Sequence, residues 1–123
     1  LKFNRLKILF MSPIDTQVFK SLLDMVGDNQ EVLAEIINCY LIESPRMIAA
    51  IQTSVTNQDT NTLGRTAHNL KSSSASLGAM NLYQLCLQLE SKVKSGNLEG
   101  VLELVSRLIN EYKQVEIALK KIV

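Results

Sequence analysis

The sequence predicts an all-α protein: an antiparallel up-and-down four-helix bundle with a short additional helix at its N-terminal end. Three observations lead to this fold class. Apolar residues recur every three or four positions along most of the 123 residues, which is the period of a helix with one buried face. No segment alternates convincingly as a strand would, and the connections between the periodic segments are short, which favours antiparallel neighbours. We expect the short helix to lie across one end of the bundle.

Residues 13–123 form the expected domain, and residues 1–12 form a linker or lead-in segment before it. A chain of 123 residues with 46% apolar content has the size of one domain and enough apolar residues for a core. The first residues, LKFNRLKILFMS, mix basic and apolar side chains. Their uninterrupted apolar run is too short to span a bilayer and lacks a signal-peptide cleavage pattern. A helix that binds a membrane surface or a partner is the alternative for this segment.

The short helix and the first long helix are expected to begin at capping residues. Ser12 before Pro13 is typical of an N-cap with proline at the first helical position, and this helix runs up to Gly27. Asp28, with a glutamate three residues later, resembles a capping box that opens the next segment. That segment contains Pro45, but its apolar stripe keeps its phase across the proline, so we expect one kinked helix rather than two. The stripe is Leu33, Ile37, Tyr40, Met47, Ile51 and Val55.

Three further helices complete the predicted bundle. Asp59 is expected to cap the helix that carries the only histidine, and Gly78 is expected to end it. The next helix begins near Asn81 and stops at Gly96, and Asn97 caps the last helix. Both of these helices have an apolar inner face. The first has Leu82, Leu85, Cys86, Leu89 and Val93, and the second has Val101, Val105, Leu108, Tyr112, Val115, Leu119 and Ile122.

Composition and missing motifs exclude several classes of function. The net charge of +1 and the 5% aromatic content offer neither the basic excess nor the stacking platforms that nucleic-acid binding uses. The chain has no glycine-rich phosphate loop of Walker or kinase type, no paired histidines for zinc and no GxSxG turn. The two cysteines, Cys39 and Cys86, fit reduced core thiols of a cytoplasmic protein better than a disulfide.

The stretch TAHNLKSSSASLGA, residues 66–79, contains the only histidine. On a helix, Leu63, Leu70 and Leu77 form one stripe and His68 lies roughly opposite, so its imidazole is expected to face outward. Mostly short side chains surround it on the same surface, with a basic residue on either flank. On this geometry alone, an exposed histidine without a role is at least as good an interpretation as a reachable nucleophile. The surrounding residues are Asn61, Gly64, Ser72 and Ala75, and the flanks are Arg65 and Lys71.

The same stretch resembles the histidine-containing phosphotransfer (HPt) domain, whose motif runs roughly AH-x-LKG-S-x-x-x-LGA. Ser72 departs from this motif, because the family most often has glycine there. The resemblance covers roughly residue 13 to the C-terminus, and it includes Asp59 before the histidine helix. The residues in register within the motif are Ala67, His68, Leu70, Lys71, Ser73, Leu77, Gly78 and Ala79, and those after it are Leu85, Cys86, Leu89 and Glu90.

The resemblance implies a cytoplasmic phosphorelay carrier of two-component signal transduction. His68 would accept a phosphoryl group from a receiver-domain aspartyl phosphate and pass it to another receiver aspartate. Imidazole is largely neutral near pH 7, so a ring nitrogen can attack phosphorus without a dedicated base. The receiver would supply Mg²⁺, and we expect no cofactor, metal or enzymatic activity of this chain's own. The expected partners of this monomer are response-regulator receivers, with a hybrid sensor kinase in the same chain as a further option.

The basic flanks have separate expected roles. Lys71, one turn beyond His68, can offset the charge of the transferred phosphoryl group, whereas Arg65 could meet the acidic mouth of a receiver. The alternative for both is a solvated helix flank. The hydroxyl of Ser72 could also hydrogen-bond the imidazole or the phosphate. For the whole chain, the alternative is a helical-bundle adaptor that binds a receiver or another signalling partner without transferring phosphate. The expected receiver-docking residues are Asn61, Gly64, Arg65, Ser72 and Ala75.

Overall fold

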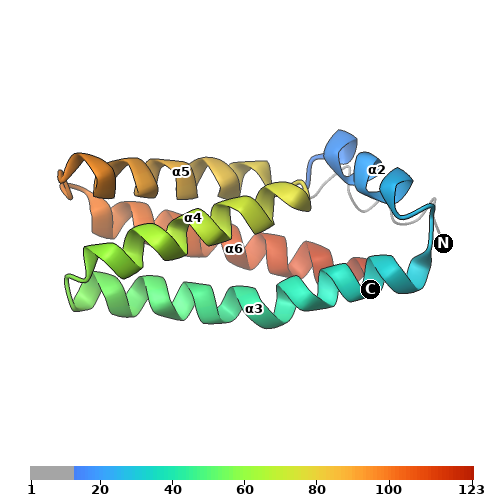
Figure 1. Ribbon diagram of the computed structural model, residues 1–123, viewed down its shortest axis with the longest axis horizontal. Helices are drawn as coiled ribbons and strands as arrows, with labels where there is room; N and C mark the ends of the chain where they lie inside the picture. Colours follow the sequence, from blue (N-terminus) through green and yellow to red (C-terminus); the bar gives the residue numbers. More distant parts are fainter. Residues whose placement is uncertain (1–12) are drawn as a thin grey trace.

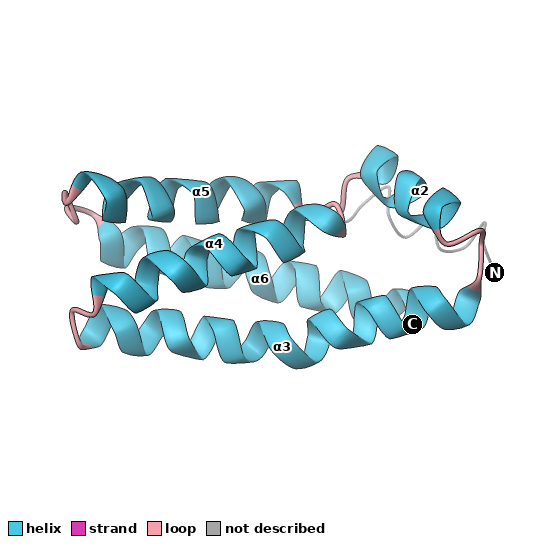
Figure 2. Ribbon diagram, in the orientation of Figure 1, coloured by secondary structure: helices cyan, strands magenta, loops and turns pink. Residues whose placement is uncertain are grey.

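The computed structural model describes residues 13–123. The regular secondary structure in this part of the chain consists entirely of α-helices. Helix α3 packs on α4, α4 on α5, α5 on α6 and α6 on α3, which closes a four-helix bundle. Figure 1 shows α2 at one end of this bundle, past the ends of α4 and α5, and Figure 2 shows short loops between the helices. The predicted fold class is confirmed. Residues 1–12, the predicted linker or lead-in, lie outside the described residues. The helices are α2 (Thr16–Met25), α3 (Gln30–Thr56), α4 (Thr60–Ser76), α5 (Met80–Ser95) and α6 (Val101–Ile122).

Helix α2 is held against the bundle by main-chain and apolar contacts. The N–H of Asp15 donates to the carbonyl of Gly78 at 2.7 Å, and Ile14 and Phe19 are buried in the core. Gly78 has a φ of +87°, and a Cβ there would lie 3.0 Å from the Asp15 carbonyl oxygen, so this close approach requires glycine. Asp15 is the N-cap of α2. The prediction that Pro13 is the first helical position was therefore wrong, because the chain is still anchored to Gly78 at that point.

Helix α3 runs through Pro45 as a single helix, as predicted, and the expected kink stays a prediction. Ser44 is buried beside the proline, and its hydroxyl donates to the Tyr40 carbonyl at 2.6 Å and lies 2.8 Å from the hydroxyl of Tyr112 on α6. The hydroxyl of Tyr40 lies 2.9 Å from that of Ser74 on α4. These contacts satisfy buried hydroxyl groups and connect α3 to two other helices.

The buried stripe of α3 differs from the predicted stripe after Tyr40. Met47 and Val55 are only half-buried, at the margin of the core, and polar residues take two of the inward positions. An apolar pattern does not register these serines, which explains the error. The observed stripe is Leu33, Ile37, Tyr40, Ser44, Ile48, Ile51 and Ser54.

Two further predicted helix caps were misplaced, and one was correct. Asp28 has a left-handed φ of +59°, and Asn29 caps α3 by accepting two hydrogen bonds from main-chain N–H groups of its first turn. Asn97 makes a similar contact within the loop, so that α6 begins only after Gly100. The carboxylate of Asp59 does accept a hydrogen bond from the first turn of α4, as predicted.

The thiols agree with only part of the prediction. Cys86 is buried in the core, but Cys39 lies exposed on the outer face of α3, and both are free. The prediction of a core thiol was therefore wrong for Cys39. Within residues 13–123, none of the helices combines the length and the apolar character needed to cross a membrane.

Candidate functional site

Helix α4 presents one side to the core and the other to solvent. Leu63, Ala67 and Leu70 are almost fully buried, whereas 56% of the His68 side chain is exposed. The predicted outward orientation of His68 is confirmed. Its position follows from the helical period, because residues two positions apart lie on roughly opposite sides of a helix.

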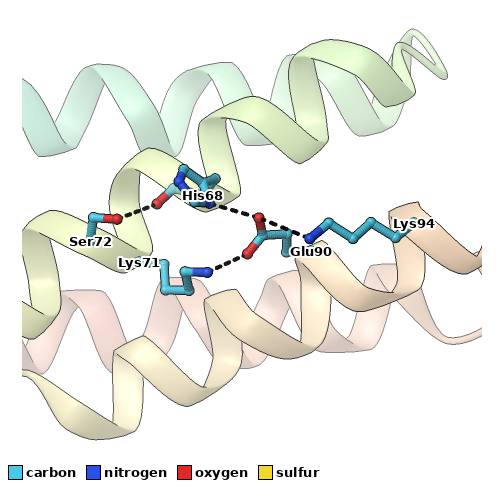
Figure 3. A network of polar contacts seen from close by, with 5 residues as sticks. All are labelled: His68, Lys71, Ser72, Glu90 and Lys94. Carbon is cyan, nitrogen blue, oxygen red and sulfur yellow. Dashed lines mark hydrogen bonds and ion pairs between the residues drawn. The ribbon is translucent and has the colours of Figure 1, made fainter.

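A carboxylate of the neighbouring helix α5 meets this histidine. Oε2 of Glu90 lies 2.8 Å from Nδ1 of His68, and Oε1 of Glu90 lies 2.6 Å from Nζ of Lys71, as Figure 3 shows. One carboxylate therefore joins two α4 side chains that lie one turn apart. The Glu90 side chain is only 8% exposed. Lys94, one turn further along α5, places its Nζ 3.8 Å from Oε2 on the open side of the cluster.

The charges in this cluster determine which histidine nitrogen is available. The hydrogen bond from Lys71, opposed by burial and supported by the hydrogen bond with His68, lowers the pKa of Glu90. The carboxylate is therefore ionised near neutral pH and only accepts hydrogen bonds, so Nδ1 of His68 is the donor. In the neutral ring, the lone pair then resides on Nε2. The contact fixes the tautomer that a nucleophilic Nε2 needs.

The contacts of the residues beside His68 agree with the predicted roles for some of these residues and differ for others. Lys71 is only 17% exposed and is paired with Glu90, so the alternative of a solvated flank is wrong for it. The hydroxyl of Ser72 donates to the main-chain carbonyl of His68 at 3.2 Å, and not to the imidazole. Asn61 and Arg65 are exposed on the same helix, as a docking surface would require.

Gly64 takes part in the packing of α4 on α5. A Cβ at this position would lie 3.1 Å from Cγ1 of Val93, closer than ordinary van der Waals contact. Val93 lies one turn from Glu90 on α5, so the missing side chain lets the two helices approach where the carboxylate reaches His68. Gly64 and the half-buried Ala75 remain predicted docking residues, but the packing explains Gly64 without a partner.

Glu90 is the site residue that sequence reasoning did not assign. It was noted only as a match to the family pattern, although its place in the sequence could have indicated a role. Glu90 directly follows Leu89 on the inner face of its helix, and a charged residue is rarely buried unless it is paired. Within residues 13–123, no group of three or more histidine, cysteine, aspartate or glutamate side chains could hold a metal ion.

The fold and the site together indicate a helical bundle of the phosphotransfer class. The family model of the Hpt domain matches residues 35–118, and the chain belongs to this family. It is also similar to the crystal structure of the histidine-containing phosphotransfer protein HptB from Pseudomonas aeruginosa PAO1. The TM-score is 0.79 and the identity is 26%, over 88% of this chain and 91% of that chain. No curated protein gives a significant match.

The protein is therefore a histidine phosphotransfer carrier of phosphorelay signalling. Hpt domains carry phosphoryl groups and are not classical enzymes, and they interact with the receiver domains of response regulators.

Proposed function

We propose that Nε2 of His68 is the phosphoacceptor, which exchanges a phosphoryl group with the aspartates of response-regulator receivers. The observation that carries this proposal is the 2.8 Å contact between Nδ1 of His68 and Glu90. It orients the only histidine of the chain and leaves Nε2 with its lone pair. The half-exposed ring is accessible to a partner of domain size.

The transfer step balances without a further reactant. Nε2 attacks the phosphorus of the receiver's aspartyl phosphate, the N–P bond forms, and the O–P bond breaks with its electron pair remaining on the aspartate. The imidazole ring becomes cationic as the bond forms, and its Nδ1–H then faces the ionised Glu90 carboxylate. Glu90 is thus a positioning residue that also stabilises the developing positive charge. We expect the Mg²⁺ to be bound by the receiver and this chain to bring no cofactor of its own.

Lys71 is proposed to assist the transferred group. Its ammonium is held by Oε1 of the same carboxylate, one turn from His68, so a short movement would let it donate to a phosphoryl oxygen. Receiver docking is proposed to use the exposed surface around His68. Its predicted residues are Asn61, Gly64, Arg65, Ser72 and Ala75. We further infer a cytoplasmic monomer that works either free-standing or beside a hybrid sensor kinase.

The test is incubation with a phosphorylated receiver, followed by detection of acid-labile, base-stable phosphate on this chain. His68→Gln should abolish the label and leave the melting temperature nearly unchanged, since an exposed side chain contributes little to packing. Asn69→Gln, a change at the neighbouring exposed position, is the matched control and should transfer normally. A His68→Gln protein that still accepts phosphate would refute the assignment. Receiver binding without any transfer by the unmodified protein would instead indicate the adaptor alternative.

A further inference from the structure

An apolar groove lies between α3 and α4, away from the histidine site. It has a volume of about 500 Å³, and its lining includes Ile36, Tyr40, Met47 and Leu77. A second hollow continues from it over Cys39 and Ile42. The groove lies on the side of α4 that packs on α3, whereas His68 and Lys71 lie on the side of α4 that meets a carboxylate of α5. The groove is therefore separate from the site of phosphoryl transfer.

The rim of this groove is acidic. Glu35 and Glu43 are the charged residues among those that line the two hollows, and both are exposed. Arg46 lies 3.5 Å from Glu43, as a largely exposed pair one turn apart, which offsets that charge only weakly. Among residues 13–123, Glu35 has no ion-pair partner. A matching occupant would present apolar side chains together with positive charge.

We propose that the groove binds residues 1–11 of the same chain. This segment, LKFNRLKILFM, has three basic residues, seven apolar residues and no acidic residue, so its chemistry complements the groove. The described chain begins beside one end of the groove, because Asp15 hydrogen-bonds Gly78 and the adjacent Leu77 lines the groove. A short tether of this kind gives an effective concentration on the order of millimolar.

The segment is also long enough. Between Glu35 and Met47 the groove follows α3 for about 18 Å, at a rise of 1.5 Å per residue. Eleven residues span about 16 Å as a helix and about 36 Å when fully extended. A second copy of the chain is a poorer occupant, because docking groove to groove would bring two acidic rims together.

Cys39 offers a direct probe of occupancy because it lies in the groove with an exposed thiol. The other thiol, Cys86, is buried, and burial raises its pKa to about 12. A neutral alkylating reagent should therefore label Cys39 alone in the folded protein, with mass spectrometry giving the rate. Binding of residues 1–11 over the groove should slow this labelling.

The decisive variant is Lys2→Glu, Arg5→Glu and Lys7→Glu in the full chain. We expect it to label Cys39 at least about fivefold faster than the unmodified protein, because an occupied groove protects in proportion to the bound fraction. Reversal of three exposed charges elsewhere, Lys20, Lys113 and Lys121, is the matched control and should leave the rate unchanged. Adding Glu35→Lys and Glu43→Lys to the N-terminal variant should restore protection. Protection in this combined variant is measured against a protein that carries Glu35→Lys and Glu43→Lys alone, because rim charges also alter thiol reactivity.

Equal labelling rates for the unmodified protein and the N-terminal variant would overturn the proposal. Protection that weakens on dilution would overturn it too, because a second copy would then be the occupant. Protection that is independent of concentration, lost on charge reversal and regained on the charge swap would establish it.

Discussion

Replacing Glu90 by glutamine probes the site most directly, because it removes the charge while almost preserving the shape. The oxygen of the new amide can replace only one of the two carboxylate oxygens, and the amide NH₂ group would face either Nδ1 of His68 or the ammonium of Lys71. Both of those groups contact the carboxylate in the structure. The negative charge that supports a cationic ring is lost in either orientation, and the preferred tautomer is lost wherever the NH₂ group faces Nδ1.

The expected effect on transfer follows from these contacts. A hydrogen bond to a charged group contributes roughly 1.5–3 kcal/mol. Because 56% of the His68 side chain is exposed to solvent, we take the lower part of that range. A loss of about 1.5–2 kcal/mol in the transition state corresponds to a rate lower by about tenfold to thirtyfold. Lys71, released from Glu90, can move to the phosphoryl group, which works in the opposite direction and limits the loss.

Two measurements separate positioning from a general structural effect. The first is the rate of phosphoryl transfer from a phosphorylated receiver, with Glu103→Gln on an exposed position of α6 as the control. The second is the ¹⁵N spectrum of the imidazole, which is unambiguous because the chain has one histidine. We expect the Nδ1–H tautomer to dominate in the unmodified protein and to lose population in Glu90→Gln.

Wild-type transfer by Glu90→Gln would show that the carboxylate does not position the nucleophile. A slower rate with an unchanged tautomer population would refute the positioning role, because the effect would then come from the lost charge, from Lys71 or from helix packing. Acid titration gives an independent check on Glu90. Its lowered pKa gives stability that is present above about pH 4.3, where an unfolded glutamate titrates, and that is lost as the pH falls through the folded pKa. The difference in unfolding free energy between the unmodified protein and Glu90→Gln should therefore shrink in acid.

Three further predictions concern the surroundings of the site and the far side of the bundle. Lys71→Ala should slow transfer about fivefold, because one partly screened charge contributes about 1 kcal/mol. It should also lower the melting temperature, because it leaves the buried Glu90 without its ammonium partner. Unchanged transfer kinetics would remove Lys71 from the mechanism. Gly64→Ala should lower the transfer rate, since its Cβ would lie 3.1 Å from Val93 and the two helices would have to shift, and the added change Val93→Ala should recover the transfer rate if spacing is the cause. Burial raises the pKa of Glu111, so this group destabilises the fold as the pH rises above about 4.3. Glu111→Gln should therefore raise the melting temperature at pH 7 and have little effect on it in acid. An equal change in melting temperature at both pH values would contradict this role of Glu111.

The fold was predictable because the apolar period extends over whole helices. Long stripes such as the one from Val105 to Ile122 determine both the helix and its buried face, and single errors do not change them. Helix starts were less predictable, since Asp28 and Asn97 are good capping residues in sequence but lie in turns. A cap requires an extended backbone as well as the right side chain, and the left-handed φ of Asp28 comes from how the chain turns between α2 and α3.

The site was predictable only within one helix. The helical period placed His68 outward and Lys71 nearby, but the carboxylate that joins them belongs to another helix and lies 22 positions further along the chain than His68. No local pattern determines which side chains meet across a helix pair, because that depends on the distance and rotation between the helices. For the same reason, sequence reasoning assigned Gly64 to docking, and only the position of Val93 shows its packing role.

The reactivity of His68 thus depends on the packing of α4 on α5 as well as on the motif. Glu90 reaches Nδ1 only while the two helices keep the spacing that Gly64 and Val93 allow. A displacement of about 1 Å between the helices would break a 2.8 Å hydrogen bond while leaving most apolar burial intact. Substitutions at this helix contact can therefore lower transfer without touching the receiver or the phosphoryl group. Such variants would differ from docking variants in one measurable respect: they would change the histidine tautomer in the free protein.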